Sequence, residues 1–145
     1  MNAVELLFEY THRVSDGRLD DAFDLFADDG AFEFPYFPSV GIGGRVAGIE
    51  TIRNNIGDFF RNRTVDFKFR DVKIFATDIP ERAFGEYSVS TTIQATGRTY
   101  NQLYGGRLES ASGKIVLLRE FCNPVEAAIA IFPNGIADLV ARTKA

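Results

Sequence analysis

The spacing of apolar residues predicts helices in the first part of the chain. Before Arg63, apolar side chains recur at every third or fourth position, which is the period of a helix that buries one face. Gly17, Pro35 and Pro38 interrupt that period and mark turns. The elements expected from this pattern are a helix over residues 4–14, a short helix through Phe23 and Phe26, a strand at Ala31–Phe34, a glycine-rich loop at 39–48 and a helix over 49–60.

After Arg63 the apolar period shortens to two, which predicts strands. Val65, Phe67 and Phe69 alternate with charged residues, and Thr96-Gly97 marks a tight turn between two long alternating runs. The expected strands cover residues 65–75, 83–95, 98–109 and 115–122, and short turns join them as an antiparallel meander.

The segment after the last strand predicts the start of another helix. Asn123 is a favourable N-cap, Pro124 suits the first helical position, and Glu126 places an acid in the first turn. The helix is expected to run to Ile131, where FPNG breaks it, and a last helical stretch follows. Helices that precede a meander predict an α+β fold, a curved sheet with helices on one face, as a single domain over residues 1–145.

Composition narrows the classes of function. The 145 residues are 46% hydrophobic and carry a net charge of −4, so there is no basic field for nucleic acid or anionic lipid. No apolar run approaches the roughly 18 residues of a membrane span, and the first residues lack the basic segment of a signal peptide. The single cysteine, Cys122, excludes an intrachain disulfide and fits a cytoplasmic location. We therefore expect neither a nucleic-acid nor a membrane partner.

The sequence contains no pattern that predicts a metal or a cofactor. One histidine, one cysteine and scattered acids give no ligand spacing. The GIGG at 41–44 resembles a phosphate loop only weakly, because no lysine and no strand–loop–helix frame accompany it. His12, on a helix flank, is interpreted as a half-exposed structural residue.

Glu120 is the residue that the pattern explains least well. By strand alternation it shares a row with Val116, Leu118 and Cys122, while Ile115, Leu117, Arg119 and Phe121 form the other row. Both rows are largely apolar, as expected if one face packs on helices and the other on a partner subunit. A carboxyl group in a helix-covered concavity would have a raised pKa suited to proton transfer. The alternative is an ion pair between Glu120 and an arginine on a neighbouring strand, such as Arg107.

Tyrosines give a second indication of a site. Tyr100, Gln102 and Tyr104 lie on one row of the third long strand, and Tyr87 lies on its neighbour. Such side chains orient a ligand if they face a pocket, or lie at a hydrated edge if they do not.

Three segments of the chain resemble the nuclear-transport-factor-2-like superfamily, and in particular its SnoaL-like branch. YTHRVSDGRLDDAFDLFADDGAFEFP resembles the two-helix opening and first strand of ketosteroid isomerases and SnoaL-like cyclases. GIETIRNNIGDFF resembles their third helix. YNQLYGGRLESASGKIVLLREFCNPVEAA is similar to the end of phenazine-biosynthesis A/B proteins, with REFxNPxE as its most specific part.

The resemblance implies a cone-shaped sheet wrapped around the N-terminal helices, with an apolar pocket inside and a homodimer through the outer face of the sheet. It also implies that Glu120 is an acid/base, as in the phenazine proteins, and that Tyr10 matches the oxyanion tyrosine of ketosteroid isomerases. The general-base aspartate of those isomerases falls on Phe34, and their oxyanion aspartate falls near Tyr104. The arginine and second aspartate of limonene epoxide hydrolases fall at about Tyr87 and Val89. Neither of these two mechanisms is complete here.

The leading hypothesis is a cofactor-free enzyme that acts on a small, largely apolar carbonyl or ring compound. Glu120, Tyr10 and Tyr104 are the expected catalytic residues. A non-catalytic module that binds an apolar ligand is the main alternative, and a dimerisation domain whose cavity is filled by phenylalanines is the third. The expected substrate-binding residues are Phe34, Tyr87, Gln102, Leu118 and Phe60.

Overall fold

A computed structural model describes residues 1–143, so the last two residues of the expected domain, 144–145, lie outside it. The described residues form helices α1 (Ala3–Ser15), α2 (Leu19–Phe23), α3 (Ile49–Asp58), α4 (Pro124–Ile131) and α5 (Ile136–Thr143), with a 3-10 turn η1 (Phe37–Val40) and a π-helical turn η2 (Phe59–Arg63). The strands are β1 (Phe26–Glu33), β2 (Arg45–Ala47), β3 (Thr64–Val65), β4 (Arg70–Ala76), β5 (Arg82–Ile93), β6 (Thr99–Ala111) and β7 (Lys114–Cys122).

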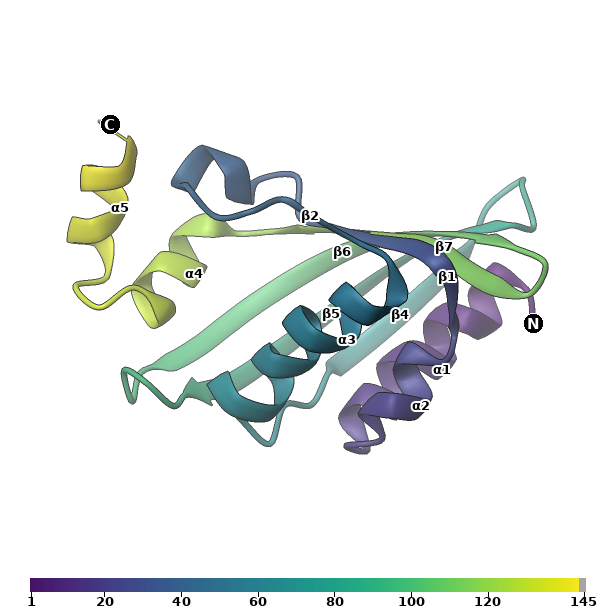
Figure 1. Cartoon of the computed structure of the whole chain (residues 1–145), viewed down its shortest axis with the longest axis horizontal. Helices are drawn as coiled ribbons and strands as arrows, with labels where there is room; N and C mark the ends of the chain where they lie inside the picture. The colour runs from purple at the N-terminus through teal and green to yellow at the C-terminus, as the bar shows by residue number, and fades with distance from the viewer. Residues whose placement is uncertain (144–145) are drawn as a thin grey trace.

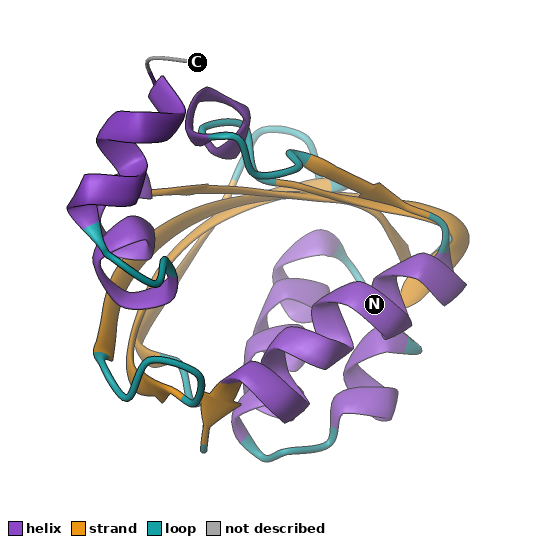
Figure 2. Ribbon diagram, turned by 60° about the vertical axis from the view of Figure 1, so that its left-hand side comes forward, coloured by secondary structure: helices purple, strands orange, loops and turns teal. Residues whose placement is uncertain are grey.

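These strands form one curved, unclosed sheet in the order β2-β1-β7-β6-β5-β3, and β4 also pairs with β5. Helices α1, α2 and α3 lie on its concave side, and α4 and α5 stand at one end of the sheet (Figures 1 and 2). The α+β fold with a curved sheet around the N-terminal helices, predicted from the sequence, is confirmed.

Capping and a buried stripe explain why α1 forms where it does. Asn2 and Glu5 make a reciprocal capping box, in which the backbone N–H of each residue donates to the side chain of the other. Leu6, Tyr10 and Val14 then bury one face of the helix against the sheet. Asn123 caps α4 in a similar way, since its Oδ1 accepts hydrogen bonds from the first turn of that helix, as predicted.

The long hairpin keeps a strict alternation that divides the sheet into two faces. On β5 every second residue from Ala83 to Ile93 is buried, and on β6 the same holds from Tyr100 to Leu108. These inner rows form the hydrophobic core together with α1, α3 and β7. The outer rows remain exposed or partly exposed.

Several local expectations are wrong, and each has a structural reason. Phe26 begins β1 and does not end α2. The expected strand over 65–75 is interrupted at residues 66–69, where Asp66 has a positive φ angle of 46°, outside the strand region. The loop at 39–48 contains β2, which pairs with β1. The meander is antiparallel, but β1 adds to β7 in parallel, a long-range pairing that no local pattern indicates.

The row assignment at the start of β7 is also wrong. The register between β6 and β7 shifts, because Glu109 pairs with Leu117 while Ser110 pairs with Ile115. The extra residue, Val116, is a β-bulge that turns Ile115 into the core and leaves Val116 partly exposed. Beyond the bulge Leu118, Glu120 and Cys122 share the inner face, as predicted.

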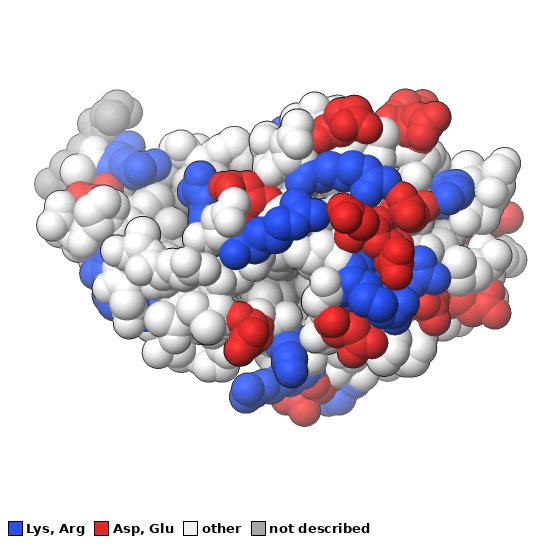
Figure 3. Space-filling view, turned by 60° about the horizontal axis from the view of Figure 1, so that its bottom comes forward, with Lys and Arg blue, Asp and Glu red and all other residues white. Residues whose placement is uncertain are grey.

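The helical side of the molecule carries charges of both signs in close contact (Figure 3). Arg53 pairs with Asp20 and Asp24, and Arg61 pairs with Asp20, so arginines and aspartates of this side neutralise one another. Within residues 1–143 no single helix is long and apolar enough to cross a membrane. Taken together, α4 and α5 have the length and composition of a span, but the chain bends by 119° between them.

Candidate functional site

A cavity of about 900 Å³ lies between the concave face of the sheet, α3 and the C-terminal helices. Its buried or partly buried wall is mostly aromatic, supplied chiefly by Phe32, Phe34, Phe59, Phe60, Phe67 and Phe69. Its exposed lining residues include the polar side chains of Asn54, Asn55, Arg63 and Arg142. The cavity therefore suits a compound with an apolar, unsaturated body.

Glu120 is the only acid in the buried part of the described cavity wall. Its side chain is 3% exposed, and Tyr87 Oη donates a hydrogen bond of 2.5 Å to its Oε2. Burial raises the pKa of Glu120 to about 7, and the hydrogen bond from Tyr87 partly opposes that rise. The alternative ion pair is not formed, because Arg107 lies on the outer face, where its Nε is 3.8 Å from Glu109.

Two tyrosine hydroxyls lie in the same cavity wall. Tyr100 Oη and Tyr104 Oη are 3.0 Å apart, and both rings belong to the inner row of β6. Burial is the main cause that raises the pKa of each phenol, so both stay neutral near pH 7 and keep a proton to donate. Tyr104, Glu120 and the aromatic wall thus meet at one surface.

Tyr10 lies behind that wall, outside the set of residues that line the cavity. Its ring packs against Phe26, Phe32 and Phe69, and its hydroxyl is buried with no hydrogen-bond partner in the described structure. Burial and the nearby charge of Glu120 raise its pKa. Its position in the core explains why it does not reach the cavity, and this corrects its placement among residues that touch a substrate.

Gln102, Tyr87 and Leu118 are likewise behind the wall and do not line the cavity. Gln102 Oε1 accepts from the backbone N–H of Asn123, and its Nε2 donates to the carbonyl of Asn123 and to Tyr100 Oη. Its amide is thus used to join β6 to the start of α4. Leu118 is fully buried in the core, and Tyr87 is turned toward Glu120.

Of the eight residues expected in the site, the structure brings four to the cavity: Phe34, Phe60, Tyr104 and Glu120. Phe59, Phe67, Phe69 and Tyr100 join them but were not among the expected binding residues. Strand alternation at 65–69 and the row shared by Tyr100 and Tyr104 carried enough signal to include three of these. No sequence pattern indicated that Arg142 would line the cavity, because its position depends on how α5 folds back toward the sheet.

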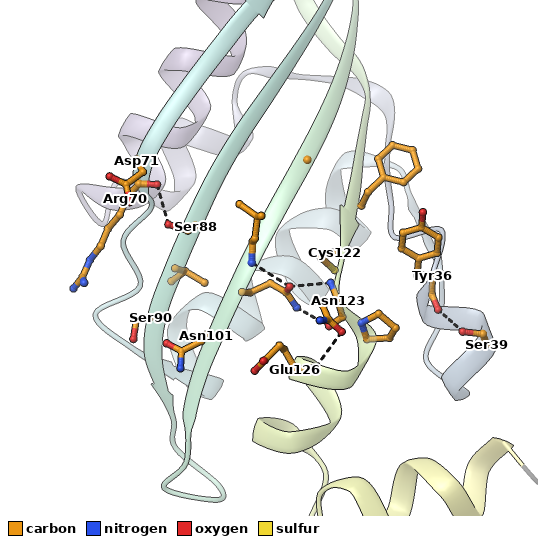
Figure 4. Close-up of a pocket in the computed structure, with 16 residues that line it drawn as sticks. Tyr36, Ser39, Arg70, Asp71, Ser88, Ser90, Asn101, Cys122, Asn123 and Glu126 are labelled. Atoms are coloured by element: carbon orange, nitrogen blue, oxygen red, sulfur yellow. Dashed lines mark hydrogen bonds between the residues drawn. The ribbon is translucent and has the colours of Figure 1, made fainter.

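A second hollow of about 940 Å³ lies on the outer face of the sheet (Figure 4). Ser88, Ser90 and Asn101 approach it from β5 and β6, Asn123 and Glu126 from the start of α4, and Tyr36 from the segment before η1. It is the more open of the two, and none of the buried tyrosines or Glu120 lines it. Gln102, one of the expected binding residues, and Cys122 line this outer hollow and not the inner cavity.

Among residues 1–143 there is no group of three or more histidines, cysteines, aspartates or glutamates arranged to hold a metal ion. His12, expected to be structural, lies half exposed on α1 with its Nε2 3.3 Å from Asp16.

Comparison with known proteins gives a consistent family assignment. A family model of the SnoaL-like domain matches residues 7–118. An uncharacterised PhzA/B-like protein from Pseudomonas aeruginosa is 34% identical over 125 residues, which is 86% of each chain.

Solved structures share the fold at lower identity. A provisionally assigned isomerase from Bacillus subtilis has a TM-score of 0.79 at 23% identity and covers 90% of this chain and 93% of its own. A phenazine biosynthesis-related protein from Pseudomonas aeruginosa has a TM-score of 0.76 at 21% identity, over 90% of this chain and 81% of its own. A provisionally assigned polyketide cyclase from Xanthomonas campestris has a TM-score of 0.74 at 21% identity, over 86% of this chain and 93% of its own.

Proposed function

The chain belongs to the SnoaL-like family, and from that premise we propose that it is a cofactor-free enzyme that moves a proton on a small apolar carbonyl or ring compound. Glu120 is the general acid/base, and Tyr104 donates a hydrogen bond to the oxygen on which negative charge develops. The observation that carries this proposal is a nearly buried carboxyl group in the wall of an aromatic cavity, next to neutral phenols.

The raised pKa is what suits Glu120 to this work. With a pKa of about 7, the carboxyl is present in both protonation states near neutral pH, so it can accept a proton and return it. In the ionised form it removes a proton from the carbon next to a carbonyl, and the electron pair moves to the carbonyl oxygen. Tyr104 stabilises that oxyanion, and the proton then returns from Glu120 to another carbon or to the same one.

The names of related structures support the reaction class without fixing it. One neighbour is provisionally assigned as an isomerase and another as a polyketide cyclase. A double-bond isomerisation next to a carbonyl and an aldol-type cyclisation both use an enolate, which one buried acid and one phenol can form. In the first the acid returns the proton to carbon, and in the second it returns the proton to the alkoxide left after the enolate carbon attacks a carbonyl. The alternative, a binding module of the same fold, is favoured by the aromatic wall of the cavity, which would hold an apolar ligand without reacting.

Exchange of a carbon-bound proton tests the proposal without knowledge of the natural substrate. A suitable probe is 2-tetralone, a bicyclic ketone whose α-protons exchange with deuterium in D₂O, followed by proton NMR. We expect the protein to accelerate this exchange and Glu120→Gln to slow it by about 10²–10⁴-fold, while the affinity for the ketone stays within about tenfold.

Glu86→Gln is the matched control, because Glu86 is exposed on the outer row of β5. It should exchange the probe at the wild-type rate. Equal rates for Glu120→Gln and wild type would contradict the proposal. Binding of the ketone without any accelerated exchange would favour the binding module.

A further inference from the structure

The side chain of Tyr87 on β5 reaches Glu120 on β7 across β6, the strand that lies between them. Tyr87 on β5 pairs with Tyr104 on β6, whereas Glu120 on β7 pairs with Gly106, two residues further along β6. The side chain of Tyr87 therefore leans over β6 at Gly106, and its hydroxyl meets Oε2 of Glu120 on the far side.

Gly106 provides the space for this crossing. A Cβ atom at residue 106 would lie 2.1 Å from Tyr87 Oη, which is far closer than Cβ atoms approach other atoms in proteins, and 3.0 Å from its Cζ, which is at the limit. The backbone does not demand a glycine there, since Gly106 is not among the residues with positive φ. The absence of a side chain at residue 106 is thus explained by the path of the Tyr87 ring.

Packing fixes the Tyr87 ring in this orientation. The ring makes an edge contact with Phe69 at 4.8 Å between centroids and stacks on Tyr104 at 5.8 Å. The side chain is fully buried, and its hydroxyl donates to Oε2, while Oε1 of Glu120 has no hydrogen bond within the described residues. One carboxyl oxygen is therefore held, and the other is left for the cavity.

We propose that Tyr87 is the positioning residue of Glu120: it holds Oε2 through the gap at Gly106, so that Oε1 faces the cavity as the atom that accepts and returns the proton. Tyr87 transfers no proton itself. When Oε1 takes the proton, the phenol keeps its own and continues to donate to Oε2. The catalytic meaning of this arrangement rests on the proposed function, but the control that Tyr87 exerts on the carboxyl does not.

Glu120 is the group that titrates near neutral pH in this cluster. The other titratable groups that face it are Tyr10 from α1, Tyr87 from β5, Tyr100 and Tyr104 from β6 and Cys122 from β7. Burial is the main cause that raises the pKa of every one of them, to about 12 for Cys122, so all remain neutral between pH 5 and 9. A titration observed at this site in that range reports Glu120.

The experiment measures that titration directly by carbon-detected NMR of the full chain labelled with ¹³C at glutamate side-chain carboxyls, with Glu120→Gln to assign the signal. Because loss of the phenol removes a hydrogen bond that favours the carboxylate, Tyr87→Phe should move the midpoint of Glu120 upward by about one pH unit. Tyr36→Phe, which removes a hydroxyl from an exposed ring, should leave the midpoint where it is. An unchanged midpoint in Tyr87→Phe would overturn the inference.

Gly106 has a matched control in its neighbour. An alanine at residue 105 would point to the other face, where its Cβ would meet only the end of the exposed Phe84 ring, at 3.0 Å. Gly106→Ala should lower Tm more than Gly105→Ala does, and this loss should shrink in a Tyr87→Phe background, where the closest atom is gone. Equal losses in both backgrounds would overturn the role of Gly106.

The two proposals fail separately. A shifted midpoint together with no accelerated exchange of the ketone would retain Tyr87 as the positioning residue and reject the enzyme. Accelerated exchange that Glu120→Gln abolishes, with no shift in Tyr87→Phe, would retain the enzyme and reject the positioning role. If both hold, the pH profile of exchange should move upward with the NMR midpoint.

Discussion

Glu120 changes its charge inside the fold at a pH where a free glutamate is already ionised. Its pKa of about 7 in the fold compares with the ordinary value of 4.5 for a glutamate, so between these values the folded chain binds more protons than the unfolded chain. The free energy of unfolding must therefore fall as pH rises through this window. At about 1.4 kcal/mol for each pH unit, the free energy of unfolding falls by roughly 3.5 kcal/mol across this window.

This effect predicts a specific difference between wild type and Glu120→Gln. Wild type should be more stable at pH 5.5 than at pH 8, and Glu120→Gln should lose most of that dependence and gain stability relative to wild type at pH 8. Urea unfolding at several pH values measures both. The carboxyls with lowered pKa, Glu33, Asp58 and Asp138, titrate below this window. Parallel stability curves for the two proteins would mean that Glu120 ionises normally.

At the scale of elements, Gln102 joins the sheet to the C-terminal helices. Its amide satisfies both the N–H and the carbonyl of Asn123, the residue that caps α4. Gln102→Met keeps the length of the side chain but leaves these backbone groups without partners, so it should cost about 2–3 kcal/mol of stability. Urea unfolding measures the loss.

Asn101→Ala is the control for Gln102→Met. Asn101 precedes Gln102 in β6 and faces outward, so its replacement should change stability by no more than about 0.5 kcal/mol. A loss for Gln102→Met no larger than that of Asn101→Ala would show that the junction does not depend on the amide.

The elements also show which parts of the molecule a sequence can reveal. Alternation placed Tyr100 and Tyr104 on one row of the same strand, because each long strand keeps a period of two, but it left open which face that row and Tyr87 take. The structure shows that all three lie on the inner face. Alternation failed at Val116, where a bulge adds one residue. Alternation also could not distinguish Glu120, which reaches the cavity, from Gln102, whose amide bonds the backbone of Asn123. That difference depends on partners from other strands and from α4.

At the scale of the whole molecule, the outer face of the sheet carries more exposed apolar surface than a polar sheet face would. Leu103 is 63% exposed at its centre, and Phe84, Phe75 and Tyr36 are also exposed. We propose that this face pairs with a second copy of the chain, so that light scattering should give the mass of a dimer. Leu103→Lys should shift the mass to that of a monomer.

Phe8→Lys provides the control for the dimer. Phe8 is a similarly exposed apolar residue, but it lies on α1, on the opposite side of the sheet. Its replacement should leave the dimer intact. A monomeric mass for wild type at micromolar concentration would contradict the proposed pairing.

The place of β7 in the sheet has a consequence for how the chain is made. β7 lies between β1 and β6, and its Arg119 contacts Glu33 of β1, 86 residues earlier. A ribosome adds about 5–20 residues each second, so β1 emerges roughly 4–18 seconds before β7 is complete, whereas β6 precedes β7 by only about 0.5–2 seconds. During the longer interval the edge of β1 that β7 will cover is free to pair with other chains. The carboxyl of Glu120 arrives on the strand that closes both edges, so a nascent chain completes its sheet and acquires its acid in the same step.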